Sequence, residues 1–133
     1  MDENPKYQAG LAVRKAVLGE QYVNQSLANA DAFMAPIQQY LTEQVWGGVW
    51  TREGLSHKTR SMLNLAMLTA LNRPNELKLH IRGAIHNGVT QEEMREIFLQ
   101  CAAYCGAPAG LDAFKLAQQV YRELAEQGTT TPG

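Results

Sequence analysis

A glutamate and a histidine four residues apart are the pair in this sequence best suited to acid–base chemistry. Glu76 and His80 lie within the stretch from Asn72 to Gly88, and residues four apart are neighbours on one face of a helix. A carboxylate beside an imidazole fixes the ring and raises its proton affinity. The alternative interpretation is a surface pair that stabilises the helix by only about 0.2–0.5 kcal/mol.

The segment around this pair has signals for both ends of a helix. Pro74 suits the first helical turn, where its missing N–H costs nothing, and Gly88 suits the position just past the end. Between them, apolar residues recur at steps of three and four and predict a buried stripe: Leu77, Ile81, Ala84 and Ile85. The helix should therefore hold His80 close to a hydrophobic core.

Apolar residues have helical spacing along the rest of the chain as well. Further helices are expected over residues 6–18, 30–45, 56–72, 90–105 and 108–126. No sustained two-residue alternation is present, so the sequence predicts an all-α fold. We expect a single domain over residues 1–133, with its core at about 6–126 and a disordered polar tail at 128–133.

Local signals refine this outline. Thr90 and Glu93 form a capping box, and Pro36 either kinks its helix or marks the first turn. Gly47 and Gly48 are expected to loosen the backbone between two tryptophans. Residues 20–23 are expected to form a short connector.

The helix over residues 56–72 is apolar nearly all round in its second half. In a domain of this size, such a helix favours a subunit interface as part of its cover. Composition excludes other partners: the net charge is −1, 19% of residues are charged, and there is no basic patch for nucleic acid or an anionic membrane. No apolar run approaches the roughly 20 residues of a membrane span, and the first ten residues have no signal-peptide core, so a cytoplasmic location is expected.

Three stretches resemble the carboxymuconolactone decarboxylase family: WGGVWTREGL, KTRSMLNLAMLTALNRPNELKLHIRGAIHNGVTQEEMREIFLQ and YCGAP. The resemblance runs from about Val13 to Tyr121. It implies an all-helical fold shared with alkylhydroperoxidase D and a homo-oligomer, such as a trimer or hexamer. It also implies cofactor-independent conversion of 4-carboxymuconolactone to 3-oxoadipate enol-lactone and carbon dioxide, a step of protocatechuate breakdown in the beta-ketoadipate pathway.

The peroxidase branch of the same superfamily has a Cys-x-x-Cys motif, then three residues and a histidine. His80, Ala84 and Gly88 match the end of that pattern, whereas Arg73 and Glu76 occupy the two cysteine positions. A thiol peroxidase needs a nucleophilic thiolate and a resolving partner. The histidine therefore carries over from the resemblance, and the thiol chemistry at that place does not.

The substrate implied by the resemblance is a small lactone dicarboxylate. Its decarboxylation requires an oxyanion donor, an acid for the ring carbon and a cation for the remaining carboxylate, but no metal or redox cofactor. His80, oriented by Glu76, is the candidate for acid or oxyanion donor.

Two arginines and two tryptophans complete the candidate site. Arg52 and Arg73 are candidates for binding carboxylate, because a guanidinium offers a flat, bidentate fork. Trp46 and Trp50 are candidates for the walls of a dry pocket, which would favour loss of the charged carboxylate. Solvated arginines and core tryptophans are the structural alternatives.

Two other functions stay open at this stage. The chain could be a non-catalytic, oligomeric binding or interaction module on the same scaffold. It could also be a thiol peroxidase that uses Cys101 and Cys105, although their spacing is not Cys-x-x-Cys.

Overall fold

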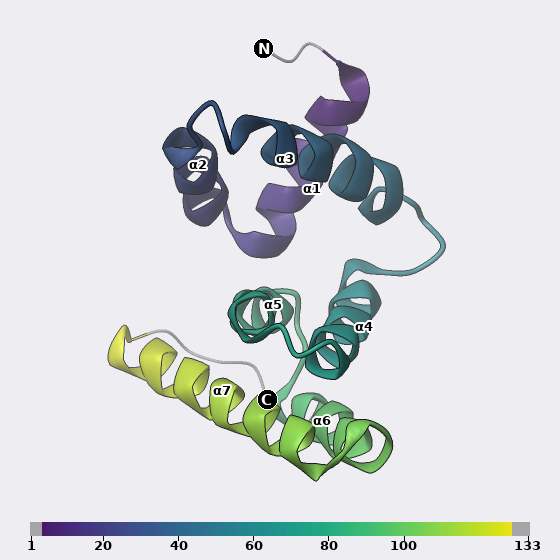
Figure 1. Ribbon diagram of the computed structural model, residues 1–133, viewed down its shortest axis with the longest axis vertical. Coiled ribbons are helices and arrows are strands. Elements are labelled where there is room, and N and C mark those ends of the chain that lie inside the picture. Colours follow the sequence, from purple (N-terminus) through teal and green to yellow (C-terminus); the bar gives the residue numbers. More distant parts are fainter. Residues whose placement is uncertain (1–3, 129–133) are drawn as a thin grey trace. The chain divides into compact units, whose positions relative to one another are not determined.

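The computed structural model describes residues 4–128, and this part of the chain is all-helical, as predicted, with no strand (Figure 1). It forms two compact units that divide between His57 and Lys58, and each is described by itself. Residues 129–133 of the predicted tail lie outside the described part. The helices are α1 (Pro5–Leu18), α2 (Glu20–Asn29), α3 (Ala35–Tyr40), the π-helix η1 (Leu41–Trp50), α4 (His57–Ala70), α5 (Pro74–His86), α6 (Gln91–Cys105) and α7 (Ala107–Glu126).

Helices α1 and η1 pack closely in the first unit because glycines face each other across their contact. A Cβ at Gly10 would collide with the backbone of Thr42 and Gly47, and a Cβ at Gly47 would collide with the carbonyl of Lys6. The expectation that Gly47 and Gly48 loosen the backbone was therefore wrong. Both lie inside the hydrogen-bonded π-helix η1, and Gly47 allows the backbones of α1 and η1 to approach.

Two other local predictions need revision in this unit. The residues expected as a connector at 20–23 begin α2, whose one buried residue, Val23, is fully shielded from solvent. Pro36 lies in the first turn of α3, so the second of its two predicted roles is correct. The apolar residues predicted to be buried just before Pro36 are not covered within the described chain, since Phe33 is 87% exposed.

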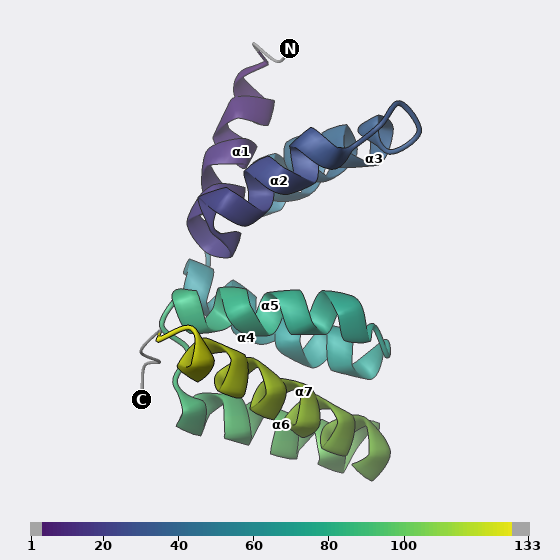
Figure 2. The ribbon, with the colours of Figure 1, turned by 90° about the vertical axis from the view of Figure 1, so that its left-hand side faces the viewer.

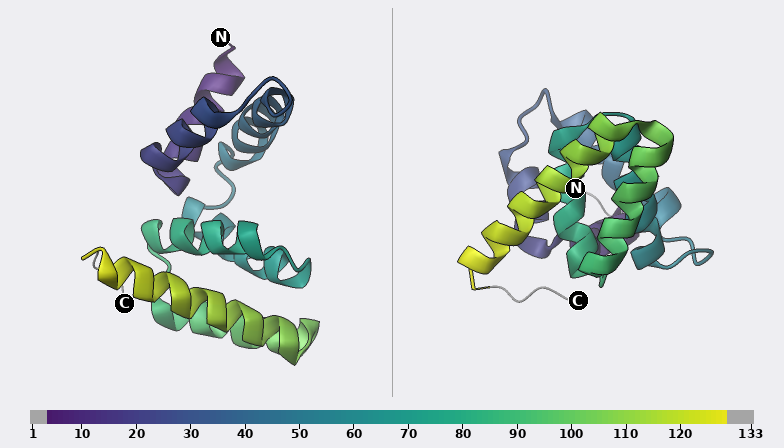
Figure 3. Two further views of the ribbon diagram at one scale, coloured as in Figure 1. Left: turned by 60° about the vertical axis from the view of Figure 1, so that its left-hand side comes forward. Right: turned by 90° about the horizontal axis from the view of Figure 1, so that it is seen from below.

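The second unit consists of two layers, one formed by α4 and α5 and the other by α6 and α7 (Figures 2 and 3). Thr90 and Glu93 form the predicted capping box at the start of α6, and Pro108 lies in the first turn of α7. Glu123 of α7 accepts hydrogen bonds from Lys78 and Arg82 of α5, which ties the layers together at their edge.

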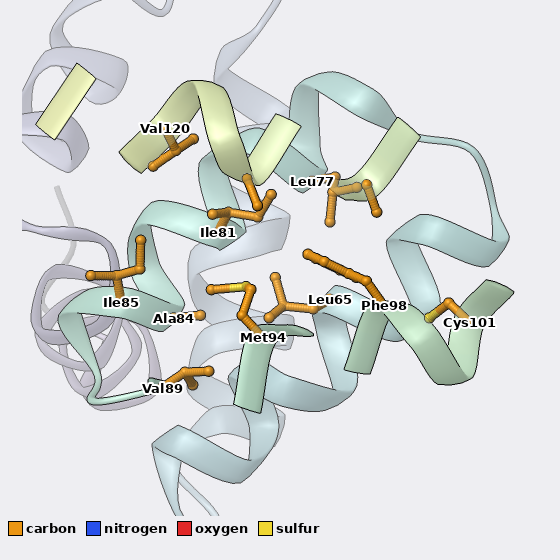
Figure 4. Packing of buried hydrophobic residues seen from close by; sticks show 12 residues of the cluster. Leu65, Leu77, Ile81, Ala84, Ile85, Val89, Met94, Phe98, Cys101 and Val120 are labelled. Carbon is orange, nitrogen blue, oxygen red and sulfur yellow. The ribbon is translucent and has the colours of Figure 1, made fainter. Parts of the chain in front are cut away.

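Apolar side chains from all four helices fill the space between these layers (Figure 4). Phe98 of α6 is fully buried and meets Phe114 of α7 edge to face, with ring centroids 6.1 Å apart. Helix α5 contributes its predicted stripe, and the buried cluster as a whole comprises Leu65, Leu77, Ile81, Ala84, Ile85, Val89, Met94, Phe98, Cys101, Ala113, Ala117 and Val120. This core fixes the position of the functional face of α5.

The other side of α4 remains exposed within the described chain. Leu63, Met67 and Leu71 follow one another at four-residue steps and are 47%, 51% and 61% exposed. The subunit interface predicted for this helix, and with it the homo-oligomer, stays a prediction. None of the helices within residues 4–128 has the length and apolar character needed to span a bilayer.

The contact between α1 and η1 makes a testable prediction about two adjacent glycines. Gly47→Ala should lower the free energy of unfolding by about 1–3 kcal/mol, because its methyl group would collide with the backbone carbonyl of Lys6. Gly48→Ala is the matched control, since its Cβ would lie 3.6 Å from the flexible Lys6 side chain and helix propensity favours alanine. Urea unfolding of both variants measures the difference, and equal stabilities would contradict the close packing.

Candidate active site

Helix α5 positions His80 through the local signals that its sequence carries. Pro74 occupies the first turn, and Gly88 has the positive φ of +93° expected after the helix end. Leu77, Ile81 and Ala84 are buried in the core of the second unit. The predicted helix is confirmed, and His80 lies beside its buried stripe.

The imidazole of His80 is buried, with 9% of its surface exposed. Its Nδ1 lies 3.4 Å from the side-chain amide nitrogen of Asn64 on α4, at the long end of the hydrogen-bonding range. An amide nitrogen only donates, and in the tautomer in which Nδ1 accepts from it the ring proton is on Nε2.

Burial lowers the pKa of His80 to about 4, because the charged ring loses its hydration. A neighbouring carboxylate can raise the proton affinity of an imidazole, but burial is the cause of the shift here. At neutral pH the ring is uncharged, so it can donate a hydrogen bond but has no imidazolium proton to deliver.

Glu76 lies in the first turn of α5 and is exposed. None of the hydrogen bonds or ion pairs among residues 4–128 involves it. The group seen against the His80 ring is Asn64, which the sequence analysis did not select. A role for Glu76 in orienting His80 stays a prediction.

Arg73 precedes α5 and points to a different part of the second unit. Its guanidinium donates to the carbonyl of Leu71. It lines a cavity of about 270 Å³ between α4, α5 and α7, together with Asp112 and Lys115, and His80 is not part of that lining. The structure therefore does not bring Arg73 and His80 into one cavity, and carboxylate binding by Arg73 stays a prediction.

The other three candidates belong to the first unit. The rings of Trp46 and Trp50 are 4.6 Å apart, and both are buried against Val17 of α1. Arg52 follows them in the chain and is exposed. The tryptophans are core residues of this unit, while their role as pocket walls and the role of Arg52 remain predictions.

The sequence analysis also missed a buried cation in the first unit. Arg14 is 4% exposed and donates a hydrogen bond of 3.1 Å to Thr42, which is itself fully buried. Its spacing with Gly10 and Val17 on the buried side of α1 is the signal that could have revealed it.

The two cysteines do not have the environment of a peroxidatic pair. Both are free thiols; Cys101 is buried and Cys105 is exposed. Burial raises the pKa of the Cys101 thiol, whereas a reactive cysteine needs a lowered pKa. This argues against the thiol-peroxidase alternative.

The comparison with known families matches residues 35–119 to the carboxymuconolactone decarboxylase family. The chain belongs to this family. The matched region contains all six candidate site residues and Asn64. The chain is therefore a member of a decarboxylase family, and its described part is all-helical.

Relatives in the family carry names with different substrates. The chain is 42% identical to a 4-carboxymuconolactone decarboxylase of Acinetobacter baylyi, over 93% of this chain and 92% of that protein. It is 43% identical to nitrosuccinic acid decarboxylase of Metarhizium robertsii, over 92% of this chain and 85% of the relative. An uncharacterised Paracoccus denitrificans protein is 36% identical over 65% of this chain and 66% of its own length.

The buried His80 predicts how stability depends on pH. The unfolded chain protonates this residue near its usual pKa of 6.5, while the folded protein does not until pH falls to about 4. Stability should therefore fall as pH drops through this window, by about 3 kcal/mol from His80 alone.

The variant His80→Gln isolates this contribution, because other groups titrate in the same range. Urea unfolding of both proteins between pH 7.5 and 4 should show the native protein losing more stability than the variant. Parallel pH profiles would contradict the lowered pKa.

Proposed function

We propose that this protein decarboxylates 4-carboxymuconolactone to 3-oxoadipate enol-lactone and carbon dioxide without a cofactor. The observation that carries the proposal is a neutral, buried His80 in a chain 42% identical, over nearly its full length, to a decarboxylase of that lactone. The substrate class is a small lactone dicarboxylate.

The reaction places new negative charge on oxygen. As the C–C bond to the carboxylate breaks, its electron pair moves through the ring double bond onto the lactone carbonyl oxygen. The resulting dienolate then takes a proton at the ring carbon next to the carbonyl. A fixed donor at the carbonyl oxygen stabilises the charge as it develops, and removing such a donor typically costs about 10²–10³ in kcat.

His80 suits the role of this donor better than that of the acid. A neutral imidazole with its proton on Nε2 can donate to an oxyanion without bringing a charge into the site. In the proposed mechanism the lactone ring carbon next to the carbonyl takes its proton from water or from another acid. A buried donor also interacts more strongly with developing charge, because little water screens it.

The remaining candidates bind and enclose the substrate in this proposal. Arg52 and Arg73 are each proposed to bind a carboxylate through a guanidinium fork. For Arg73 this requires its side chain to leave the cavity that it lines in the free chain, because His80 is not part of that lining. Trp46 and Trp50 provide apolar surface, which disfavours the charged carboxylate relative to carbon dioxide. Glu76 remains the candidate for orienting His80.

A second candidate substrate is nitrosuccinate, which the 43% identity to nitrosuccinic acid decarboxylase favours. Loss of carbon dioxide from the carbon that bears the nitro group leaves a nitronate, with its charge on the nitro oxygens. The demand on the protein is the same: a neutral donor to an oxygen that becomes negative. The two substrates differ in shape, but in both reactions His80 would donate a hydrogen bond to an oxygen that becomes negative.

The activity test measures release of carbon dioxide from freshly prepared 4-carboxymuconolactone by chelator-treated protein. His80→Ala should lower kcat by about 10²–10³, because it removes an oxyanion donor. His86→Ala is the matched control: it is an exposed histidine on the same helix, and it should keep native activity. Equal activity of the native and His80→Ala proteins would remove His80 from the mechanism, and no release by the native protein would overturn the function.

The substrate test compares kcat/KM for 4-carboxymuconolactone and nitrosuccinate in the same preparation. We expect the lactone to be preferred by at least about 10-fold, the discrimination that one or two pocket contacts provide. A preference for nitrosuccinate would move the assignment to the second candidate, and His80→Ala should then impair that reaction instead.

A further inference from the structure

We propose that Asn64 is a positioning residue that fixes the tautomer of His80, with Nδ1 accepting from the Asn64 amide and Nε2 carrying the proton. The catalytic meaning of this tautomer rests on the proposed function. The tautomer itself does not, because it is a property of the unliganded protein.

The contact belongs to a polar seam between α4 and α5. Asn64 of α4 meets His80 of α5 over 3.4 Å, and Asn87, which follows α5, donates to Ser61 of α4 over 3.1 Å. Ser61 and Asn64 are one helical turn apart, so both face α5. No charged residue is present on α4 from Ser61 to its end at Ala70.

Ser61, Asn64 and Thr69 are the polar residues of α4 between Ser61 and Ala70, and each has a hydrogen-bond partner. The Thr69 hydroxyl donates back to the carbonyl of Leu65 on its own helix, so it does not cross to α5. Asn64 is half-buried, and a buried amide without a partner would cost about 1–3 kcal/mol. The contact with the His80 ring is therefore stabilised, because losing it would leave the Asn64 amide without this partner.

An amide at this position differs from a carboxylate in what it does to the imidazole. A carboxylate would accept a hydrogen bond from Nδ1–H and stabilise the charged ring, as in a catalytic triad. The Asn64 amide nitrogen instead donates, which leaves the ring neutral and directs its N–H to Nε2. This is the protonation state that a hydrogen-bond donor to an oxyanion requires.

The competing interpretation is that Asn64 only joins the two helices, as Ser61 does through Asn87. Stability measurements do not separate these roles, because loss of either contact weakens the same seam. The ¹⁵N chemical shifts of the ring do separate them, since protonated and unprotonated imidazole nitrogens have well-resolved shifts. Ser61→Ala is the matched control, because it alters the seam without touching His80.

The experiment records ¹⁵N spectra of histidine-labelled protein at pH 7.5, with His80→Gln used to assign the signals. We expect His80 in the native protein and in Ser61→Ala to have an unprotonated Nδ1 and a protonated Nε2. Asn64→Asp should move a proton onto Nδ1, and Asn64→Leu should leave a mixture of tautomers. Circular dichroism checks that each variant is folded.

The native spectrum alone can overturn the proposal, whether or not the variants fold. A proton on Nδ1 in the native protein would mean that the Asn64 amide oxygen accepts from the ring. Asn64 variants that fold and keep the native shifts would show that another group sets the tautomer.

Activity measurements connect the tautomer to turnover. Asn64→Asp should lower kcat on 4-carboxymuconolactone by about 10²–10³ with little change in KM, because it misdirects the donor, while Ser61→Ala should stay close to native activity. A native protein with the expected tautomer but no activity on the lactone would overturn the proposed function and leave the role of Asn64 standing. Equal kcat for Asn64→Asp and the native protein would overturn the catalytic part of the inference.

Discussion

Burial of one imidazole against α4 is the constraint on which the proposed chemistry of this protein depends. Removing His80 from water costs the charged ring its hydration and leaves the neutral ring almost unaffected. The ring therefore stays uncharged through the neutral range of pH. A neutral ring is a weak acid but a good hydrogen-bond donor. This favours the proposed role of oxyanion donor for His80 over the role of acid.

The helical scaffold provides this environment through packing between its layers. Apolar side chains of α4 to α7 form the core, and α5 presents one polar ring beside it. A neutral donor in such a place serves any decarboxylation in which charge moves onto oxygen. The chain is similar to relatives named for a lactone and for a nitro acid, and in both of those decarboxylations negative charge moves onto oxygen.

Signals in neighbouring residues were enough to predict α5, because Pro74 and Gly88 mark its ends wherever the rest of the chain lies. Features that arise between helices were not predicted. Gly47 was interpreted from its own flexibility, whereas its role is to let α1 approach η1. The lowered pKa of His80 was not predicted, and Asn64 was missed, because the spacing of residues along one helix shows neither burial nor a contact from another helix.

The central claim is that His80 is neutral when the protein works, and an NMR titration of its ring tests this most directly. The carbon-bound ring protons of the native protein are followed from pH 8 to pH 3.5. We expect the His80 signals to stay constant to below pH 5 and to titrate with a pKa of about 4. A pKa at or above the ordinary value of about 6.5 would contradict the account, because the ring would then be able to act as an acid.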